Sequence, residues 1–456
     1  MALIRASAPL CRELGRALPE RPFHVRFWDG GVVAATEQDA PTFFVRRPSA
    51  ISHFLRAPGT MGLGRAYVDE SLAVDDLDAA FAVVDEWQPP ALGVREQLRL
   101  GAALLTAAAP GGVPRRPSLE LILRGSLHSV ERDAAAVRYH YDVGNEFFAL
   151  FLDESMTYSC ALFTRGAQTL EEAQRAKLDL VAGKLALQQG TRVLDVGCGW
   201  GSFAIHAARE YGVSVTGVTL SPPQAELARA RVRDAGVQDR VEIRVADYRS
   251  LPGSSFDVIA SIGMAEHVGE AQIDLYARSL FALLRPGGTL LNHAIAALDP
   301  NHEPHEDLFS TRYVFPDGEP LPLSRVQLAV ERAGFETRHV EGLREDYAIT
   351  LRHWSERLDE HLDRARELAG AERTRVWRLY LRAARRGFDT GHTTVYQVLA
   401  CRPEHARGAP AQGSGTAFSG AREGAREGGG APGRDHEPAP EAALMAGGVS
   451  PQPRTT

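Results

Sequence analysis

Residues 193–201, Val-Leu-Asp-Val-Gly-Cys-Gly-Trp-Gly, decide the fold of this 456-residue chain. The apolar residues Val193, Leu194 and Val196 predict a short buried strand. Closely spaced glycines follow, and a helix is expected from Ser202 to Glu210. Glycine lets the backbone adopt a positive φ and approach a ligand closely, because it has no Cβ. A strand, a glycine-rich turn and a helix in this order are typical of a nucleotide-binding site.

The spacing of the glycines separates this turn from the dinucleotide-binding turn. Gly197, Gly199 and Gly201 follow the pattern G-x-G-x-G, whereas dinucleotide folds carry G-x-G-x-x-G. The shorter spacing suits S-adenosylmethionine (SAM), which has no pyrophosphate group. Asp195, at the end of the strand, can also favour the positive charge of the SAM ammonium or sulfonium. The turn alone leaves another nucleotide open as the ligand.

The segment after the turn favours SAM over a dinucleotide. A second strand is predicted at 214–220, and dinucleotide folds usually place a carboxylate at its end to bind the ribose hydroxyls. Here Thr219, Ser221 and Gln224 stand near that end instead. Gln224 is the nearest side chain that can both donate and accept hydrogen bonds with a diol.

Three more strands complete the predicted sheet. The strand at 241–245 runs into Asp247 and Tyr248, which would offer a carboxylate to the adenine amino group and an aromatic wall beside the ring. Strands at 256–262 and 290–295 follow. Strands that alternate with helical patterns predict an α/β, doubly wound, Rossmann-like domain with a parallel sheet. A generic Rossmann-like domain with another nucleotide is the alternative.

Composition argues against several classes of protein. The formal net charge of −7 argues against a general nucleic-acid binder, which would carry a basic surface. The four cysteines show no paired spacing, so neither a disulfide framework nor a zinc knuckle is indicated. Pro304 interrupts the histidine-rich stretch 301–307, where no metal is expected. Residues 1–16 lack a signal-peptide pattern, and the longest apolar run, 100–109, is shorter than the about 20 residues that span a bilayer. We therefore expect a cytoplasmic or peripheral protein.

Length and composition predict three regions. Residues 1–125 are expected to form a smaller N-terminal α/β accessory domain. Its β-like runs are 23–28, 31–34 and 42–46. Residues 126–400 are expected to form the domain with the glycine turn. Residues 401–456 are rich in Gly, Ala, Pro, Arg and Glu, with too few apolar groups to offset the entropy of ordering, so we predict a disordered tail.

A second informative segment lies at 139–163. It predicts a helix near 142–151, a turn, and a strand-like run at 157–163. Packing of the helix on the sheet would explain its phenylalanines. That interpretation leaves the polar cluster at 158–160 unexplained.

Seven segments in order carry a resemblance to a known family. They are HYDVGNEFF…LDESMTYSCALF, LDVGCGWGSFAIHAA, GVTLSPPQ, SIGMAEHVG, LRPGG…LLNHAIA, YVFPDGEPLP and DYAITLRHW. Together they resemble the cyclopropane-fatty-acyl-phospholipid synthases, a SAM-dependent family that includes the mycolic acid cyclopropane synthases. The N-terminal region resembles the extra domain of the phospholipid-acting branch. The resemblance implies a class I SAM methyltransferase fold and a lipid bilayer as the source of substrate.

The resemblance also implies a reaction and a set of catalytic residues. Family enzymes are expected to transfer the SAM methyl group to a cis double bond, which leaves a carbocation on the acyl chain. A bound bicarbonate then removes a proton from the added methyl group, and the ring closes. The residues implied to hold bicarbonate are Cys160, Glu266, His293, Ile295 (through its backbone) and Tyr347. Glu266 would share a hydrogen bond with the bicarbonate hydroxyl or hold His293 in position.

These residues have structural alternatives. Glu266 could cap a helix, His293 could be a core histidine, and Cys160 could be a small buried residue. Tyr347 lies on a predicted helix, where aromatic residues usually belong to the core. Many family members carry a cysteine in the helix before the final strand. This chain has Ala384 there, so a covalent cysteine mechanism is not expected.

The expected function combines these residues. The predicted cofactor contacts are Tyr158, Ser159, Asp195, Gly197, Gly199, Trp200, Gly201, Thr219, Ser221, Gln224, Asp247 and Tyr248. The resemblance implies cyclopropane formation on unsaturated phospholipid acyl chains at the inner face of a membrane, by a monomer or a homo-oligomer, with no nucleic-acid partner. The alternatives are a methyl- or methylene-branched fatty acid from the same carbocation, a small-molecule methyltransferase, and a non-catalytic lipid- or SAM-binding protein.

Overall fold

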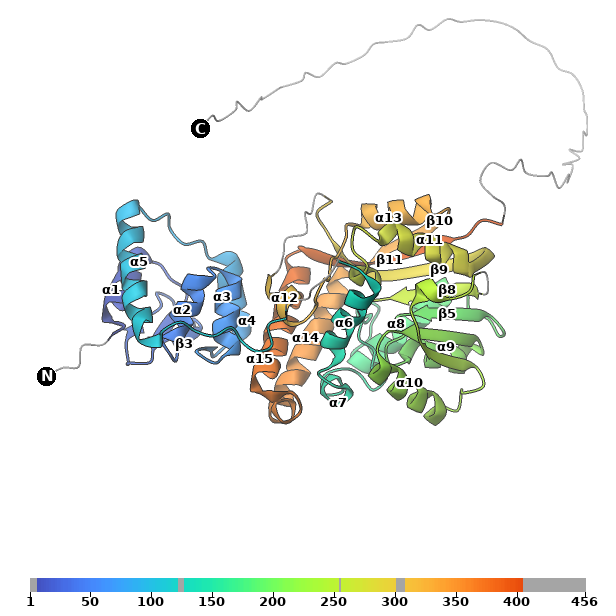
Figure 1. The fold of residues 1–456 in the computed structure, drawn as a ribbon, viewed down its shortest axis with the longest axis horizontal. Helices are drawn as coiled ribbons and strands as arrows, with labels where there is room; N and C mark the ends of the chain where they lie inside the picture. Colours follow the sequence, from blue (N-terminus) through green and yellow to red (C-terminus); the bar gives the residue numbers. More distant parts are fainter. Residues whose placement is uncertain (1–5, 122–126, 254–255, 301–307, 405–456) are drawn as a thin grey trace, which may run out of the picture. The chain divides into compact units, whose positions relative to one another are not determined.

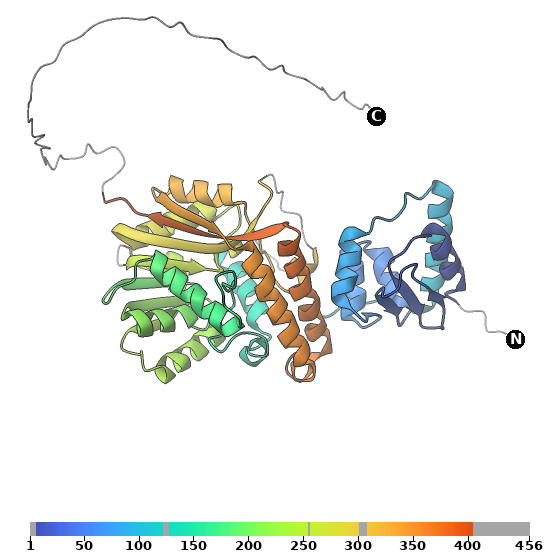
Figure 2. The ribbon, with the colours of Figure 1, turned by 180° about the vertical axis from the view of Figure 1, so that it is seen from behind.

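The computed structural model describes residues 6–121, 127–253, 256–300 and 308–404 (Figures 1 and 2). The histidine-rich stretch 301–307 and most of the predicted tail lie outside the described residues. Two sheets organise the described chain, one of four strands and one of seven. Among the helices of the described ranges, none combines the length and apolar character needed to cross a membrane.

The four-stranded sheet belongs to the N-terminal region and has the order β2-β1-β3-β4. Its strands are β1 (His24–Phe27), β2 (Val32–Val33), β3 (Thr42–Val45) and β4 (Leu72–Val74). The helices are α1 (Ala8–Ala17), α2 (Ser49–Arg56), α3 (Thr60–Val68), α4 (Leu77–Glu86) and α5 (Val94–Ala108). The predicted β-like runs correspond to β1, β2 and β3. Alternate residues such as Val25 and Phe27 pack with Leu10 and Ala107 in a core of this region's own.

The seven-stranded sheet has the order β10-β11-β9-β8-β5-β6-β7. Its strands are β5 (Arg192–Val196), β6 (Ser214–Thr219), β7 (Val241–Val245), β8 (Phe256–Ile262), β9 (Leu284–Ala297), β10 (Glu336–Gly342) and β11 (Thr393–Cys401). The strands from β9 to β7 pair in parallel, as predicted. Strands β11 and β10 extend this sheet in the antiparallel sense, which the sequence pattern did not indicate.

Helices cover both faces of this sheet, as the predicted doubly wound fold requires (Figure 1). Successive strand residues point to opposite faces, so Val193 packs with one group of helices and Leu194 with the other. The first group is α8 (Leu170–Lys184), α9 (Ser202–Tyr211) and α10 (Pro222–Asp234). The second is α11 (Ile273–Leu283) and α13 (Leu323–Arg332). The strands therefore consist of continuous runs of apolar residues, because both of their faces are buried.

The segment 139–163 differs from the prediction. Helix α6 (Val130–Tyr141) ends within its first residues, and α7 (Asn145–Phe148) is a single turn that follows Gly144, whose φ is +98°. The expected strand at 157–163 is wrong, because side chains of neighbouring helices satisfy the backbone in place of another strand. Thr350 accepts from the Ala161 N–H at 3.1 Å, and Asp346 accepts from the Phe163 N–H at 2.6 Å.

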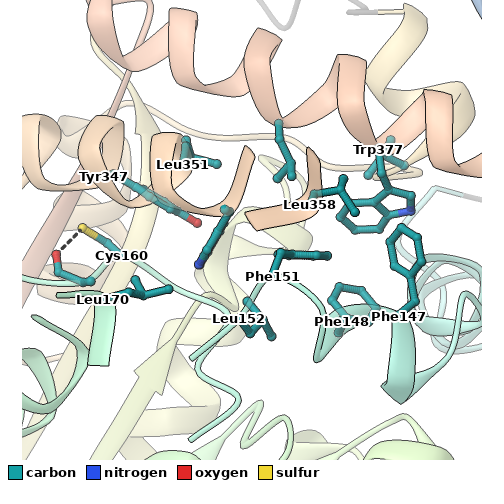
Figure 3. Close-up of a cluster of buried hydrophobic side chains, with 14 of the residues drawn as sticks. Phe147, Phe148, Phe151, Leu152, Cys160, Leu170, Tyr347, Leu351, Leu358 and Trp377 are labelled. Atoms are coloured by element: carbon teal, nitrogen blue, oxygen red, sulfur yellow. Dashed lines mark hydrogen bonds between the residues drawn. The ribbon is translucent and has the colours of Figure 1, made fainter. Parts of the chain in front are cut away.

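Two long helices complete this region, namely α14 (Arg344–Glu360) and α15 (Leu362–Asp389). They pack on the 147–163 segment through a cluster of buried aromatic and aliphatic side chains (Figure 3). Helix α15 also contacts the N-terminal region. Arg382 lies 3.0 Å from Asp78, Arg386 lies 2.6 Å from Asp85, and Arg375 donates to the Leu72 carbonyl. The remaining helix in this region is α12 (Leu308–Tyr313).

Candidate functional site

The predicted site residues gather at one edge of the seven-stranded sheet. Strand β5 lies between β6 and β8, so the direction of chain progression reverses there. Ligands of open α/β sheets bind in the crevice at the carboxyl ends of strands at such a point. Three adjoining cavities lie at this edge, and Tyr141 and Gly263 line all of them.

The strand-end cavity contains most of the residues predicted to contact adenosine. Its lining includes Gly197, Gly199, Thr219, Gln224, Asp247 and Tyr248. The Thr219 hydroxyl donates to Gln224 Oε1 at 2.9 Å, which orients the amide. Arg249 Nη2 donates to the Asp247 carboxylate at 2.6 Å, so an arginine fixes this acid. The cavity therefore offers an oriented amide and an oriented carboxylate, two groups that can recognise a ribose diol and an amino group.

The turn cavity lies beside the glycines. Its lining includes Tyr158, Ser159, Asp195, Gly197, Gly199, Trp200 and Gln224. The Trp200 indole N–H donates to Asn145 Oδ1 at 2.7 Å, which ties the turn to α7. The Asp195 side chain is buried, and its Oδ2 has no hydrogen-bond partner among the described residues. Burial raises the pKa of Asp195 to about 7.

Two predicted contacts lie beside the cavities and not in their lining. Gly201 precedes α9 with a φ of +81°, and a Cβ there would lie 3.4 Å from the Ala228 side chain. Ser221 caps α10, where its hydroxyl accepts from the Gln224 N–H at 3.4 Å. Both residues shape the turns that carry the lining residues.

The aromatic cavity brings together all five predicted catalytic residues. Its lining includes Cys160, Glu266, His293, Ile295 and Tyr347. These residues come from segments far apart in the sequence, and only the fold places them side by side. The cavity has a volume of about 40 Å³. One water molecule needs about 10–15 Å³, so a small ion of a few heavy atoms fits.

Glu266 is a buried carboxylate with unused hydrogen-bonding capacity. It lies on a short 3-10 turn, Ala265–His267, after β8. The Ile295 backbone hydrogen-bonds to its carboxylate, while Oε2 has no partner among the described residues. Burial raises the pKa of Glu266 to about 7. A carboxyl with a pKa near neutrality can exchange a proton at physiological pH.

His293 presents a hydrogen-bond donor to the same cavity. Lys184 donates to Gln397 Oε1 at 2.7 Å, so Gln397 Nε2 is the donor to His293 Nδ1 at 3.0 Å. The proton of the neutral ring therefore lies on Nε2, which has no partner among the described residues. Burial lowers the pKa of His293 to about 3, so the ring stays neutral. Gln397 thus orients His293, a role that the sequence had suggested for Glu266.

Cys160 and Tyr347 both line the aromatic cavity and lie near each other in Figure 3. Burial raises the pKa of the Cys160 thiol well above its usual value, and its Sγ lies 3.6 Å from the Leu343 carbonyl oxygen. A protonated thiol held by carbonyl groups is a poor nucleophile. Tyr347 lies on α14 against Phe388, with ring centroids 4.6 Å apart. Ala384 lines this cavity too, so a methyl group stands where many family members have a second thiol.

Aromatic rings form the wall between the turn cavity and the aromatic cavity. Tyr158 stacks on Trp354 with centroids 5.2 Å apart and on His140 at 5.6 Å. Burial lowers the pKa of His140 to about 3, so this wall carries no positive charge. The π faces of such rings attract cations. Sequence reasoning missed Gln397 and Lys177, because neither stands in a glycine turn or a motif of the resemblance.

Known proteins share this architecture. The family model described as mycolic acid cyclopropane synthetase matches residues 128–398. A probable fatty acid methyltransferase of Pseudomonas putida is 39% identical over 84% of this chain and 92% of its own length. The cyclopropane-fatty-acyl-phospholipid synthase of Escherichia coli K12 is 33% identical over 78% of this chain and 87% of its own.

A solved structure agrees with these sequence relatives. The mycolic acid cyclopropane synthase CmaA1, complexed with S-adenosylhomocysteine (SAH) and CTAB, aligns with a TM-score of 0.56 and 35% identity. The alignment covers 59% of this chain and 98% of that one. The chain therefore belongs to the cyclopropane synthase family and is a SAM-dependent methyltransferase of the cyclopropane-fatty-acyl-phospholipid synthase type.

Proposed function

We propose that this enzyme converts cis double bonds of unsaturated phospholipid acyl chains into cyclopropane rings. The observation that carries the proposal is the placement of Glu266, His293 and Tyr347 in one aromatic cavity that adjoins the glycine turn. Gln224 and Asp247 would hold the adenosine part of SAM in the strand-end cavity. SAM supplies an electrophilic methyl group on its sulfonium. This group would face the acyl chain near Gly263, which lines all three cavities.

The aromatic wall suits the chemistry of a double bond. Methyl transfer converts the alkene into a carbocation, which water would trap. The rings of Tyr158 and Trp354 are buried or nearly so and lie face to face. They exclude water and offer π electrons that stabilise a positive charge by about 0.5–2 kcal/mol each. A small-molecule methyltransferase would not need such a wall.

The buried polar groups suit a bound bicarbonate as the base. The His293 Nε2–H and the Tyr347 hydroxyl would donate to its oxygens, and Glu266 would accept from its hydroxyl group. The partnerless atoms Glu266 Oε2 and His293 Nε2 favour this assignment, because buried polar groups normally have partners. Bicarbonate would supply the base that takes a proton from the added methyl group.

A bicarbonate depletion experiment tests the base. Turnover should fall in buffer freed of carbon dioxide and recover when bicarbonate is added. The control is SAH affinity, which should not change. Full turnover without bicarbonate would overturn the assignment, and Glu266 itself, with a pKa of about 7, would then be the candidate base.

A branched fatty acid is the second candidate product. The relative from Pseudomonas putida carries the name fatty acid methyltransferase, which favours this alternative. All of these products start from the same carbocation. Loss of a proton from the added methyl group gives the ring when that carbon bonds to the cationic carbon, and gives a methylene branch when a hydride shift comes first. A saturated methyl branch keeps all the methyl hydrogens and needs a hydride from a separate reductant. Mass spectrometry of lipids from an expressing host separates a saturated methyl branch from a ring. Proton NMR separates the ring from a methylene branch.

The N-terminal region supports a membrane source for the substrate. We propose that it is an accessory domain that places the enzyme on the inner face of the membrane. Helix α5 exposes Val94, Leu98 and Leu105 by 72%, 69% and 64%. These positions lie on one face of the helix, and Arg95 and Arg99 are exposed on the same helix. An apolar stripe beside arginines suits insertion between anionic headgroups.

Vesicle binding tests this surface. Leu98→Glu together with Leu105→Glu should lower binding to vesicles that contain phosphatidylglycerol and lower turnover on such vesicles. Turnover on detergent-dispersed phospholipid should stay unchanged, because α5 contributes nothing to the three cavities. Unchanged vesicle binding would contradict the surface. The matched control is Gln97→Glu together with Ala102→Glu, which adds the same charge at exposed positions of α5 off the apolar stripe and should leave vesicle binding in high salt unchanged.

A further inference from the structure

A row of polar side chains crosses the antiparallel part of the seven-stranded sheet. His293 on β9 lies directly opposite Gln397 on β11, and Gln397 lies directly opposite Glu341 on β10. Residues opposite each other on neighbouring strands point to the same face of a sheet. Their side chains therefore form one line from the aromatic cavity to β10, the edge strand of the sheet.

Lys184, the last residue of α8, binds the outer end of this row. Its ammonium donates to Gln397 Oε1 at 2.7 Å and to a carboxylate oxygen of Glu341. Arg165 pairs with the other carboxylate oxygen of Glu341. Gln397 is fully buried, whereas the side chains of Lys184 and Glu341 are 10% and 21% exposed. An ion pair near the edge of the sheet thus contacts a buried amide that lies beside the cavity.

The ammonium of Lys184 fixes the direction of the hydrogen bonds along the row. An ammonium can only donate, so it holds the amide oxygen of Gln397 and leaves the amide N–H group to face His293. Nδ1 of His293, which lies 3.0 Å from Gln397 Nε2, must then accept. The hydrogen bond that one ring nitrogen of a neutral histidine makes decides whether the other nitrogen carries the proton.

We propose that Lys184 is a positioning residue that, through Gln397, keeps the proton of His293 on Nε2 and so makes the aromatic cavity a site for an anion. Glu341 holds the ammonium in place. With the proton on Nδ1, the ring would turn a lone pair toward the cavity and repel an anion. After burial, the positive charges of Lys177 and Lys184 also lower the pKa of His293, so a second proton on the ring is disfavoured.

The inference rests on the proposed binding of bicarbonate beside His293, and it concerns residues that lie behind that site. NMR of protein with isotope-labelled histidines tests it, because the chemical shifts of the two ring nitrogens show which one carries the proton. The His293→Asn variant identifies the signals. In the wild type the proton should lie on Nε2.

Lys184→Met removes the donor and should bring in the other tautomer. The dissociation constant of bicarbonate, followed at the same signals, should rise by about tenfold, the order expected for a hydrogen bond to a charged group. The KM for bicarbonate should rise by the same factor, while kcat at saturating bicarbonate and SAH affinity stay within about twofold. Lys184→Arg should restore the tautomer and the affinity, because a guanidinium also only donates.

Arg165→Met is the matched control. It removes a cation from Glu341 but leaves the hydrogen bond from Lys184 to Gln397 in place. This variant should change neither the tautomer nor the affinity for bicarbonate. Equal changes in Arg165→Met and Lys184→Met would contradict the inference, because the loss of any charge near Glu341 would then be sufficient.

The tautomer and the turnover distinguish this inference from the proposed base. A wild-type His293 with its proton on Nδ1 would overturn the inference, and this measurement needs no variant to fold. An unchanged tautomer in Lys184→Met would overturn it as well. If Lys184→Met changes the tautomer but wild-type turnover is independent of bicarbonate, the proposed base is wrong and the positioning role of Lys184 is confirmed.

Discussion

The turn cavity and the aromatic cavity adjoin each other, yet their chemistry differs. The turn cavity is lined by two buried groups that can carry opposite charges, Lys177 and Asp195, and neither forms an ion pair among the described residues. The aromatic cavity holds rings, a neutral His293, and a single ionisable carboxyl, Glu266, whose pKa burial raises to about 7. The turn cavity is suited to bind a ligand through charged groups, and the aromatic cavity is suited to exclude water from a reaction. Substitutions on the two sides should therefore separate affinity from turnover.

The largest separation is expected for Glu266→Gln. The amide keeps the size of the side chain but cannot carry the negative charge that makes a bound base stronger. Turnover should fall by about 10²–10⁴-fold, the usual contribution of an acid–base group. SAH affinity, measured by calorimetry, should stay within about twofold of the wild type. A Glu266→Gln variant with near wild-type turnover in bicarbonate-free buffer would show that the residues of the aromatic cavity have a structural role and do not hold the base.

The reverse separation is expected for Gly199→Val. Gly199 has a φ of +54° and lines both the strand-end and the turn cavities. A branched side chain there would be strained and would fill the space of the ligand, so SAH affinity should fall by about 100-fold or more. Gly236→Val is the matched control, because Gly236 has a φ of +67° and open space around it. If both variants lose stability but keep SAH affinity, the cofactor lies elsewhere.

The pH dependence of turnover should report the aromatic cavity, and the pH dependence of SAH affinity should report the turn cavity. Both should have the same midpoint. The pKa values of Glu266 and Asp195 are both raised to about 7 by burial, so each group loses its charge as the pH falls through neutrality. Turnover at saturating SAM should fall by about tenfold per pH unit well below the midpoint, and Glu266→Gln should lack this limb. SAH affinity should also fall with falling pH. An unchanged affinity profile in Asp195→Asn would contradict the assignment.

The smallest effect is expected for residues 405–456, whose composition predicts too few apolar groups to form a core. Deletion of 405–456 should leave SAH affinity and turnover unchanged and shift Tm by no more than about 2 °C. Deletion from Arg402 should cost more. Arg402 donates to the Phe281 and Leu284 carbonyls at 2.8 and 2.6 Å, and its backbone pairs with Gly288. Equal melting temperatures for the two truncations would contradict this anchoring role.

The sequence predicted the strands of the sheet better than the contents of the site. Strands β7 and β8 have the predicted bounds because continuous apolar runs between turns have few alternatives. The segment 157–163 has the composition of a strand, but its Ala161 and Phe163 N–H groups donate to side chains that come almost two hundred residues later. No local pattern can reveal such partners.

The position of Lys177 in its helix is a sequence feature that indicates a buried lysine. Its helix has an apolar stripe that includes Leu170, Ala173, Leu178 and Val181, and Lys177 falls on this stripe. A lysine on the buried face of a helix differs from one on the polar face, although composition cannot tell them apart. The sequence around Gln397 contains no comparable signal. The side chains of β11 alternate between the two faces of the sheet, and a single amide side chain in such a strand is common.

The protonated thiol of Cys160 has a consequence for oxidative stress. Peroxides and disulfides attack thiolates, so a buried thiol with a raised pKa resists both. Ala384 also lines the aromatic cavity, where Cys160 is the single cysteine among the described lining residues. Cys11 and Cys401 are partly exposed and are the sites that thiol reagents reach first. Lipid modification by this enzyme should therefore continue in oxidising conditions that stop enzymes with a reactive cysteine.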